Sequence, residues 1–190
     1  MIKPYDYSHR KGVEEISWEY FGLLSASLAE RLAVESIEVI IGIARAGLFP
    51  ATAVACALRR ELFPVRVTRR QNDQIVAKHP IWKVDVSADV RDKVVAVVDE
   101  IADTGETLAQ VAQRVREKGA ARVITASLVS HGWADPPPDY VALVSQALVI
   151  FPWDKYVYQD RQWQCHPELA DALALQRRLH EDAESDPGTQ

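Results

Sequence analysis

The sequence predicts one α/β domain with a mostly parallel sheet flanked by helices. Through the middle of the chain, short apolar segments alternate with segments of helical composition, which is the order of βαβ units with right-handed crossovers. The apolar segments are nearly continuous, as in strands that are buried on both faces of a parallel sheet. The 190 residues, 48% of them hydrophobic, suffice for one compact core.

The first half of the chain predicts two helices and two strands. Apolar residues recur at spacings of three, four and one over 12–33, as an amphipathic helix requires, and a largely apolar strand follows over 36–43. The Ala- and Leu-rich segment 48–58 predicts a helix, and 63–68 predicts the next strand. Residues 69–91 are polar without a sustained period and predict a long loop, with or without a small hairpin. Loops of this length are often functional lids.

The second half predicts further strands and two helices. The most hydrophobic strand is expected over 93–98, ending on an acidic pair, and the next helix is expected from about 105 to 118, closed by Gly119. Strands are then expected over 122–129, 140–144 and 147–151, a last helix over 166–180, and a flexible tail over 181–190.

Composition excludes several classes of protein. The formal net charge is −5, the wrong sign for a chain that wraps a nucleic acid polymer. No apolar run is long enough to cross a bilayer, and the first residues lack the order of a signal peptide, so we expect a cytoplasmic protein without a membrane partner. The two cysteines, Cys56 and Cys165, fit neither a disulfide scaffold nor a zinc site.

Residues 99–107 carry the most specific chemistry. Ligands of open parallel sheets bind at the carboxyl ends of the strands, and this run follows the most hydrophobic strand. Backbone N–H groups at the start of the next helix suit a phosphate, and Gly105 allows its close approach. The pair Asp99 and Glu100 could hold ribose hydroxyls or hydrated Mg²⁺, so the run as a whole fits a phosphorylated sugar. Taken alone, Asp103 or Thr104 could merely cap the helix, with the acidic pair as a solvated strand end.

Two motifs in this order resemble a known family. Residues 94–108, Val-Val-Ala-Val-Val-Asp-Glu-Ile-Ala-Asp-Thr-Gly-Glu-Thr-Leu, resemble the phosphoribosyl pyrophosphate (PRPP) signature of type I phosphoribosyltransferases, and residues 40–51 are similar to that family's pyrophosphate-binding turn. The resemblance implies the type I phosphoribosyltransferase fold, a Rossmann-like sheet with a small variable hood. Here it would form a single domain over 1–180, with the lid at about 69–91 and the hood at about 1–34 and 145–165.

The resemblance implies roles for the acidic and phosphate-binding residues. Asp99 and Glu100 would contact the ribose hydroxyls and would bind Mg²⁺, the expected cofactor, through water. Asp103 would be the general base for the attacking nitrogen and would favour positive charge developing on the ribose ring. The expected PRPP contacts are Asp99, Glu100, Asp103, Thr104, Gly105, Glu106, Thr107, Ala46 and Arg70.

Basic residues would contact the pyrophosphate. Arg45 matches the arginine of the pyrophosphate turn, where this chain has Arg45-Ala46-Gly47 and the family often has Arg-Gly-Gly. Arg69 and Arg70 resemble the basic position ahead of the catalytic lid, and the sequence does not decide which of the two points inward. The catalytic residues that the resemblance implies are Asp103, Arg45 and Arg69.

The base-binding residues are predicted from a resemblance that is less complete. Residues 147–154 resemble the base-binding segment of bacterial and archaeal xanthine, guanine and hypoxanthine enzymes, especially in Pro-Trp-Asp. By that resemblance Leu148 would cover the purine, Val149 would offer backbone groups, and Asp154 would belong to the same site. The lysine that binds the 6-oxo group in those enzymes is missing, and His131 is either its replacement or a loop histidine without a ligand.

The leading hypothesis is a PRPP-dependent phosphoribosyltransferase of purine salvage. It would convert PRPP and a nitrogenous base, expected to be a purine, into a nucleoside monophosphate and pyrophosphate, and by resemblance it would form a homo-oligomer. The alternative is a non-catalytic protein on the same fold that binds PRPP or a nucleotide and regulates a partner. A dinucleotide-binding Rossmann domain is disfavoured because no GxGxxG follows any predicted strand.

Overall fold

The computed structural model describes residues 9–68, 70–71, 74–75 and 81–185. The chain divides into a larger compact unit, Gly22–Val144, and a smaller one that combines residues 1–21 with 145–190. The predicted hood segments, about 1–34 and 145–165, overlap the smaller unit. The single domain over 1–180 stays a prediction.

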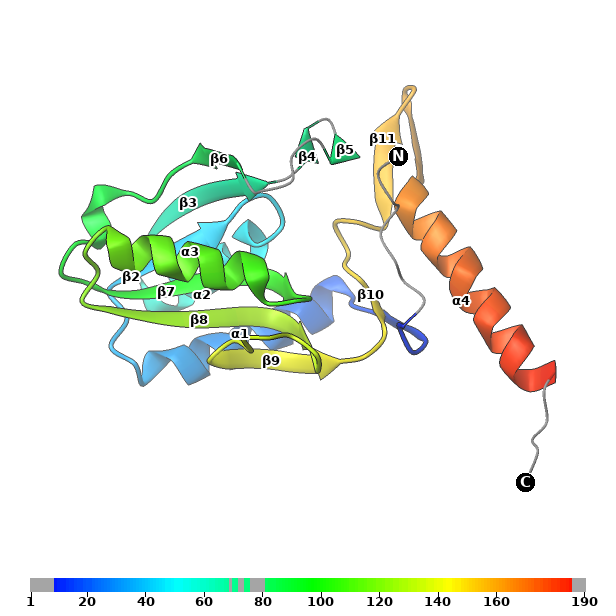
Figure 1. The fold of residues 1–190 in the computed structure, drawn as a ribbon, viewed down its shortest axis with the longest axis horizontal. Coiled ribbons are helices and arrows are strands. Elements are labelled where there is room, and N and C mark those ends of the chain that lie inside the picture. Colours follow the sequence, from blue (N-terminus) through cyan, green and yellow to red (C-terminus); the bar gives the residue numbers. More distant parts are fainter. Residues whose placement is uncertain (1–8, 69, 72–73, 76–80, 186–190) are drawn as a thin grey trace. The chain divides into compact units, whose positions relative to one another are not determined.

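The larger unit is built on a six-stranded sheet with the order β6-β3-β2-β7-β8-β9 (Figure 1). Strands β3, β2, β7 and β8 are parallel to one another, and β6 adds to β3 as an antiparallel edge. The predicted mostly parallel sheet is therefore confirmed. The strands are β2 (Val39–Ile43), β3 (Glu61–Thr68), β6 (Ile81–Val84), β7 (Val94–Ala102), β8 (Arg122–His131) and β9 (Tyr140–Ser145).

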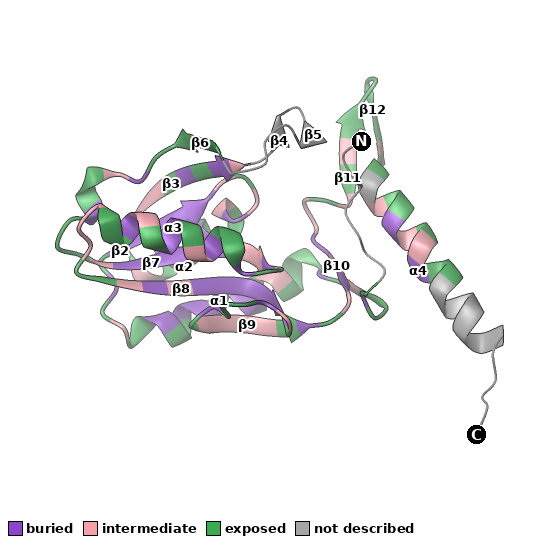
Figure 2. Cartoon of the chain, in the orientation of Figure 1, coloured by how far each residue is buried: buried purple, intermediate pink, exposed green. Residues whose placement is uncertain are grey.

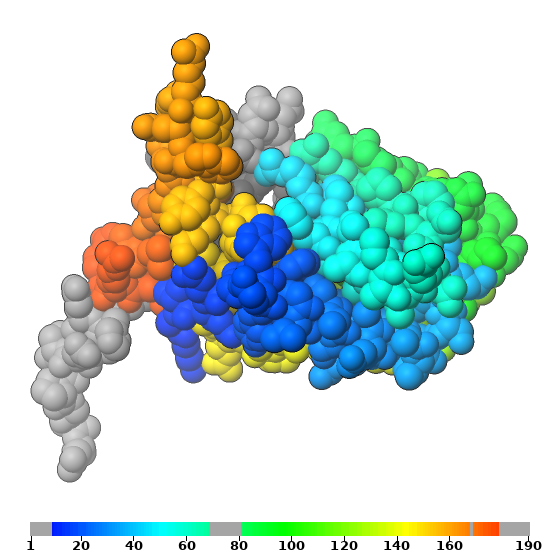
Figure 3. All heavy atoms as spheres, turned by 180° about the vertical axis from the view of Figure 1, so that it is seen from behind, coloured from blue at the N-terminus to red at the C-terminus, as the bar shows by residue number. Residues whose placement is uncertain are grey.

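Helices cover both faces of this sheet. In Figure 1, α3 (Glu106–Glu117) lies in front of the strands, and α1 (Trp18–Ala33) and α2 (Leu48–Leu58) lie behind them. The view from behind shows α1 and α2 at the surface, in blue and cyan (Figure 3). The strands between the two layers are buried along most of their length (Figure 2), which explains their continuous apolar sequences.

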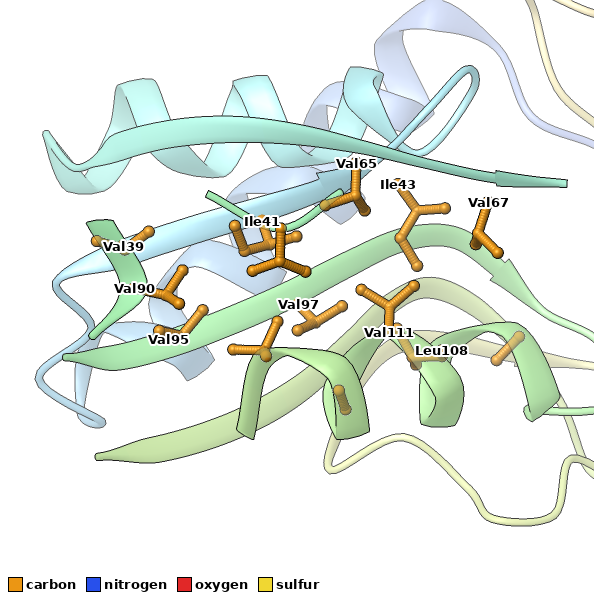
Figure 4. Packing of buried hydrophobic residues seen from close by; sticks show 14 of the residues in the cluster. Val39, Ile41, Ile43, Val65, Val67, Val90, Val95, Val97, Leu108 and Val111 are labelled. Atoms are coloured by element: carbon orange, nitrogen blue, oxygen red, sulfur yellow. The ribbon is translucent and has the colours of Figure 1, made fainter. Parts of the chain in front are cut away.

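Successive residues of the central strands enter opposite halves of the core. Val39, Ile41 and Ile43 of β2 pack toward α3 (Figure 4), whereas Ile40 packs toward α1 and α2. At Gly42 the helix α2 approaches so closely that a Cβ would lie 2.8 Å from the Ala51 Cβ atom. The strand β7 alternates in the same way, with Val95 and Val97 on the α3 side and Ala96 and Val98 on the other.

The prediction of one helix over 12–33 is wrong at its start. Residues Val13–Glu15 form a short strand, β1, and α1 begins at Trp18. The Ser17 hydroxyl accepts a hydrogen bond from the Tyr20 N–H (3.1 Å), as an N-cap residue does. Val13 and Ile16 match the helical spacing, but the backbone of β1 pairs instead with Leu148–Ile150.

The predicted long loop over 69–91 contains more structure than its sequence indicated. The optional small hairpin is present as β4 (Arg70–Gln71) and β5 (Gln74–Ile75). The edge strand β6 and a short 3₁₀ helix, η1 (Ala88–Val90), were not predicted, because each is very short and β6 is mostly exposed. Val90 is fully buried, so this part of the segment belongs to the core.

The smaller unit contains two pairs of strands and the last helix. β1 pairs in parallel with β10 (Leu148–Ile150), and β11 (Tyr156–Gln159) forms an antiparallel hairpin with β12 (Gln162–Cys165). This hairpin was not predicted from the sequence. The helix α4 (Pro167–Ser185) is longer than predicted, so residues 181–185 are helical and not a tail, and 186–190 lie outside the described residues.

The structure also describes the two cysteines and the hydrophobicity of the helices. Cys56 and Cys165 are free thiols at exposed positions. Among the described residues, no helix is both long and apolar enough to span a membrane.

Candidate functional site

The acidic pair lies inside strand β7 and not at its end. β7 continues to Ala102, because Ile101 and Ala102 still pair with Val129 and Ser130 of β8. Asp99 is buried, and its Oδ1 atom accepts a hydrogen bond from the Glu100 N–H (3.0 Å). Burial, and secondly the neighbouring Glu100 carboxylate, raise the pKa of Asp99 well above its usual range.

The turn between β2 and α2 lies directly against this carboxylate. A Cβ on Gly47 would lie 2.5 Å from Asp99 Oδ1 and 2.6 Å from the Ile43 carbonyl oxygen, so the position accepts no side chain. Arg45 is exposed in the same turn, and the peptide bond between Ala44 and Arg45 is cis. The fold thus brings together the two motifs that the sequence analysis singled out.

The turn between β7 and α3 supplies the predicted phosphate-binding groups. Gly105, the N-cap residue of α3, has a φ of 83°, a conformation that favours glycine. The Thr104 hydroxyl accepts a hydrogen bond from the Glu106 N–H (3.4 Å), and Thr104, Glu106 and Thr107 are exposed. Exposed hydroxyls beside a helix N-terminus form a suitable environment for an anion.

Asp103, the first residue of this turn, is half-buried beside the end of β8. The Trp133 indole N–H donates to Asp103 Oδ1 (3.2 Å), and His131 Nε2 lies 4.0 Å from the same oxygen. Burial raises the pKa of Asp103, while the Trp133 hydrogen bond and the proximity of His131 lower it; the net direction is upward.

His131 is the last residue of β8, not a loop residue, because that strand runs past Val129. Its side chain is buried and stacks on the Trp133 ring, with centroids 4.5 Å apart and an interplanar angle of 11°. Trp133 was not predicted as a site residue from the sequence. The available signal was its position shortly after β8, whose parallel neighbour β7 carries the acidic pair.

The two candidate arginines ahead of the lid are not placed by the structure. Arg69 lies outside the described residues. Arg70 begins β4, of which the backbone alone is described.

The candidate base-binding segment belongs to the smaller unit. Leu148 is buried and pairs with Val13 across the two strands β1 and β10, Val149 is half-buried, and Asp154 is exposed. Beside them, Phe151 stacks on Trp153 with ring centroids 4.9 Å apart. His131, the fourth candidate for base binding, belongs to the larger unit.

The residues present fit Mg²⁺ bound mostly by water and substrate. Among the described residues, no group of three or more His, Cys, Asp and Glu side chains is arranged to hold a metal ion. Mg²⁺ usually keeps several waters and binds through one or two carboxylates together with substrate phosphates. Asp99 and Glu100 offer two such carboxylates.

Comparison with known proteins identifies the class to which this fold and site belong. Residues 14–160 match the family model for the phosphoribosyl transferase domain. The chain belongs to this family, which confirms the resemblance drawn from the two motifs. A comparison with curated proteins gave no match.

Solved structures support the same fold. A purine phosphoribosyltransferase from Pyrococcus horikoshii is 29% identical over 78% of this chain and 98% of its own, with a TM-score of 0.68. A hypothetical protein from Neisseria gonorrhoeae with bound ppGpp is 19% identical over 90% of this chain and 98% of its own, with a TM-score of 0.66. The xanthine-guanine-hypoxanthine phosphoribosyltransferase of Helicobacter pylori is 18% identical over 76% of this chain and 93% of its own, with a TM-score of 0.59. The last two are likenesses of fold alone.

Proposed function

We propose that this protein transfers the phosphoribosyl group of PRPP to a purine base, releasing pyrophosphate and a nucleoside monophosphate. The observation that carries the proposal is the contact of Asp99 with the Gly47 turn, because it joins the acidic pair and the pyrophosphate turn in one site. The phosphate-binding turn at Gly105 follows the same strand. A diol, a pyrophosphate and a phosphate therefore have recognition groups at one edge of the sheet.

In this proposal the larger unit binds PRPP. The helix α3 N-terminus with Thr104, Gly105, Glu106 and Thr107 holds the 5-phosphate, and the Asp99 and Glu100 carboxylates accept hydrogen bonds from the ribose hydroxyls. Ala46 and Arg45 contact the pyrophosphate, and Arg69 or Arg70 approaches it from the start of the lid. When bound with the substrate, Mg²⁺ held at Asp99 and Glu100 through water supplies positive charge to the leaving pyrophosphate.

The chemical step needs a proton acceptor close to the base. A ring nitrogen of the purine forms a bond to the ribosyl carbon C1, and the bond from C1 to the pyrophosphate oxygen breaks, with its electron pair leaving on the pyrophosphate. The proton of the attacking nitrogen moves to Asp103 and then to solvent. The Asp103 carboxylate also stabilises the positive charge on the ribose ring in the transition state.

The purine is assigned to residues of the smaller unit. In this assignment Leu148 covers the ring, the Val149 backbone contacts the base edge, and Asp154 accepts a hydrogen bond from a ring N–H. The purine phosphoribosyltransferase of Pyrococcus horikoshii, 29% identical, supports a purine as the substrate class.

The test is pyrophosphate release from PRPP and Mg²⁺ with adenine, guanine, hypoxanthine and xanthine in turn. We expect turnover with at least one purine and none with orotate or uracil. Release with a pyrimidine alone would overturn the purine assignment, and saturable PRPP binding without any release would overturn the enzymatic proposal.

A second candidate is a nucleotide-binding regulator. It is favoured by the absence of a lysine at the end of β8, where residues 128–133 read Leu-Val-Ser-His-Gly-Trp. The Neisseria gonorrhoeae protein of similar fold contains ppGpp, so a guanine nucleotide is the ligand to try. The regulator is supported if ppGpp binds and no base is turned over. It is contradicted if a purine is converted to its monophosphate.

A further inference from the structure

The connection between β8 and β9 packs directly on the turn that carries Asp103. In the parallel register, Ala102 of β7 pairs with Ser130 of β8, so the next residues, Asp103 and His131, leave the two strands side by side. Trp133 follows His131 by two residues, and its indole N–H reaches Asp103 Oδ1.

Backbone contacts extend this packing beyond Asp103. The Asp135 N–H donates to the Thr104 carbonyl oxygen (2.9 Å), and a Cβ on Gly105 would lie 2.3 Å from the Pro136 carbonyl oxygen. The residues from 131 to 136 therefore touch three successive residues of the β7–α3 turn.

The side chains form a stack that ends on the carboxylate. His131 is buried in the sheet edge, and its ring lies flat against the Trp133 ring, with 11° between the two planes. The His131 Nε2 atom lies 4.0 Å from Asp103 Oδ1, beyond hydrogen-bond distance, whereas the indole N–H lies within it. His131 therefore contacts Trp133 by stacking, and Trp133 contacts Asp103 through a hydrogen bond.

We propose that Trp133 is a positioning residue that orients the Asp103 carboxylate through its indole N–H, and that His131 orients Trp133 by stacking instead of binding the base. This inference rests on the proposed function, in which Asp103 accepts the proton. It replaces the role that the sequence analysis considered for His131. The β8–β9 connection then sets the general base in place.

The kinetic test uses Trp133→Phe, which keeps an aromatic ring and removes the donor, with Trp163→Phe at an exposed tryptophan as the matched control. A hydrogen bond to a charged group contributes about 1.5–3 kcal/mol, so kcat should fall about tenfold to 100-fold, with the KM for PRPP unchanged. The control should match the wild type. In an Asp103→Asn background, Trp133→Phe should have little further effect. Equal losses in both backgrounds, or a change confined to the KM for PRPP, would overturn the proposal.

His131 is tested by two replacements. His131→Phe keeps a flat ring for stacking and should retain most of the wild-type kcat. His131→Ala should lower kcat about threefold to tenfold, because it removes the stacking free energy of an aromatic pair. If both variants instead raise the KM for the base and leave kcat unchanged, His131 binds the base and the stacking role is wrong.

A readout without turnover keeps this inference separate from the proposed function. In a ¹H–¹⁵N spectrum of the full chain, the five tryptophans give five indole signals, and the Trp133 signal is the one that Trp133→Phe removes. Asp103→Asn should move that signal to higher field and should leave the Trp163 signal in place. An unmoved Trp133 signal would overturn the contact even if the enzyme is active, whereas an inactive enzyme with the expected movement would count against the proposed function alone.

Discussion

The two compact units hold their candidate site residues in different settings. In the larger unit, Asp99 is buried in a strand that lies between β2 and β8, and the Gly47 turn packs closely against one side of its carboxylate. In the smaller unit, Asp154 is exposed and follows a three-residue strand that pairs with one other short strand. The first setting fixes atoms through close packing with neighbouring elements of the sheet layer. The second depends on a few local residues, so it can vary without loss of the central sheet.

This difference leads to separate predictions for the binding of PRPP and for the binding of the purine base. Changes in the larger unit should alter PRPP binding or folding steeply. Changes in the smaller unit should alter the affinity for the base more gently and should leave PRPP binding intact.

The largest effect is expected from the double variant Asp99→Asn with Glu100→Gln. Loss of two charged acceptors should weaken the affinity for PRPP in the presence of Mg²⁺ by about 100-fold or more, measured by calorimetric titration. Asp92→Asn is the control, since Asp92 is exposed just before β7 and has a φ of 60°, which Asn tolerates. Wild-type affinity in the double variant would show that PRPP does not bind at this carboxylate pair.

Gly47→Ala should destabilise the larger unit by about 1–3 kcal/mol in denaturant unfolding, because the new methyl group overlaps Asp99 Oδ1 and the Ile43 carbonyl oxygen. Gly22→Ala is the matched control: no atom lies within 4 Å of its Cβ position, and Ala in a helix should stabilise by roughly 0.5–1 kcal/mol. Equal stability of the two variants would contradict the close packing of the Gly47 turn.

In the smaller unit, Asp154→Asn should raise the KM for the purine about tenfold, because the variant loses the free energy of a charge-assisted hydrogen bond at the low end of its range. The KM for PRPP should not change. Asp160→Asn, at an exposed residue of the β11–β12 turn with a φ of 52°, serves as the control. A rise in the KM for PRPP instead of the KM for the base would remove the distinction between the two units.

The smallest effect is expected for a surface ion pair of the larger unit. The Arg114 guanidinium donates to both Asp85 oxygens (2.9 and 2.7 Å), and Arg114, followed by Lys118, lowers the pKa of the Asp85 carboxyl. Because the folded-state pKa is lowered, the pair stabilises the fold at neutral pH, and this contribution is lost as the pH falls below the ordinary pKa near 3.8 and through the lower folded value.

Asp85→Asn should therefore lower Tm by at most about 3 °C at neutral pH, and the difference should shrink in acid and in high salt. Glu30→Gln on the exposed side of α1 is the control. A difference that grows as the pH falls would contradict the sign of the pKa shift.

The sequence predicts the central strands well because of their burial. β2, β7 and β8 lie between two layers of helices, so both faces require apolar residues and the apolar runs are continuous. The strands that were missed, β1, β6, β11 and β12, are short and largely exposed. β1 pairs with β10, which lies far along the chain, while β11 and β12 pair with each other across a turn at Asp160 and Arg161 that lacks the usual glycine.

The same reasoning divides the candidate site. The residues from Asp99 to Thr107 are contiguous, so the order of a strand, acidic pair, turn and helix could be seen in the sequence. The hydrogen bond between Trp133 and Asp103 joins residues 30 positions apart and depends on β8 continuing to His131 beside β7. The contact of Gly47 with Asp99 likewise depends on the order of strands in the sheet.

The most direct test of a transferase centred on the end of β7 compares the wild type with Asp103→Asn. Initial rates of pyrophosphate release are measured with PRPP, Mg²⁺ and the accepted purine, the nucleoside monophosphate is identified by mass spectrometry, and the Kd for PRPP is measured separately. We predict that the wild type forms the monophosphate and that Asp103→Asn lowers kcat by about 10²–10⁴-fold with the Kd for PRPP unchanged. Equal rates for the two proteins would contradict the assignment of Asp103 as the base.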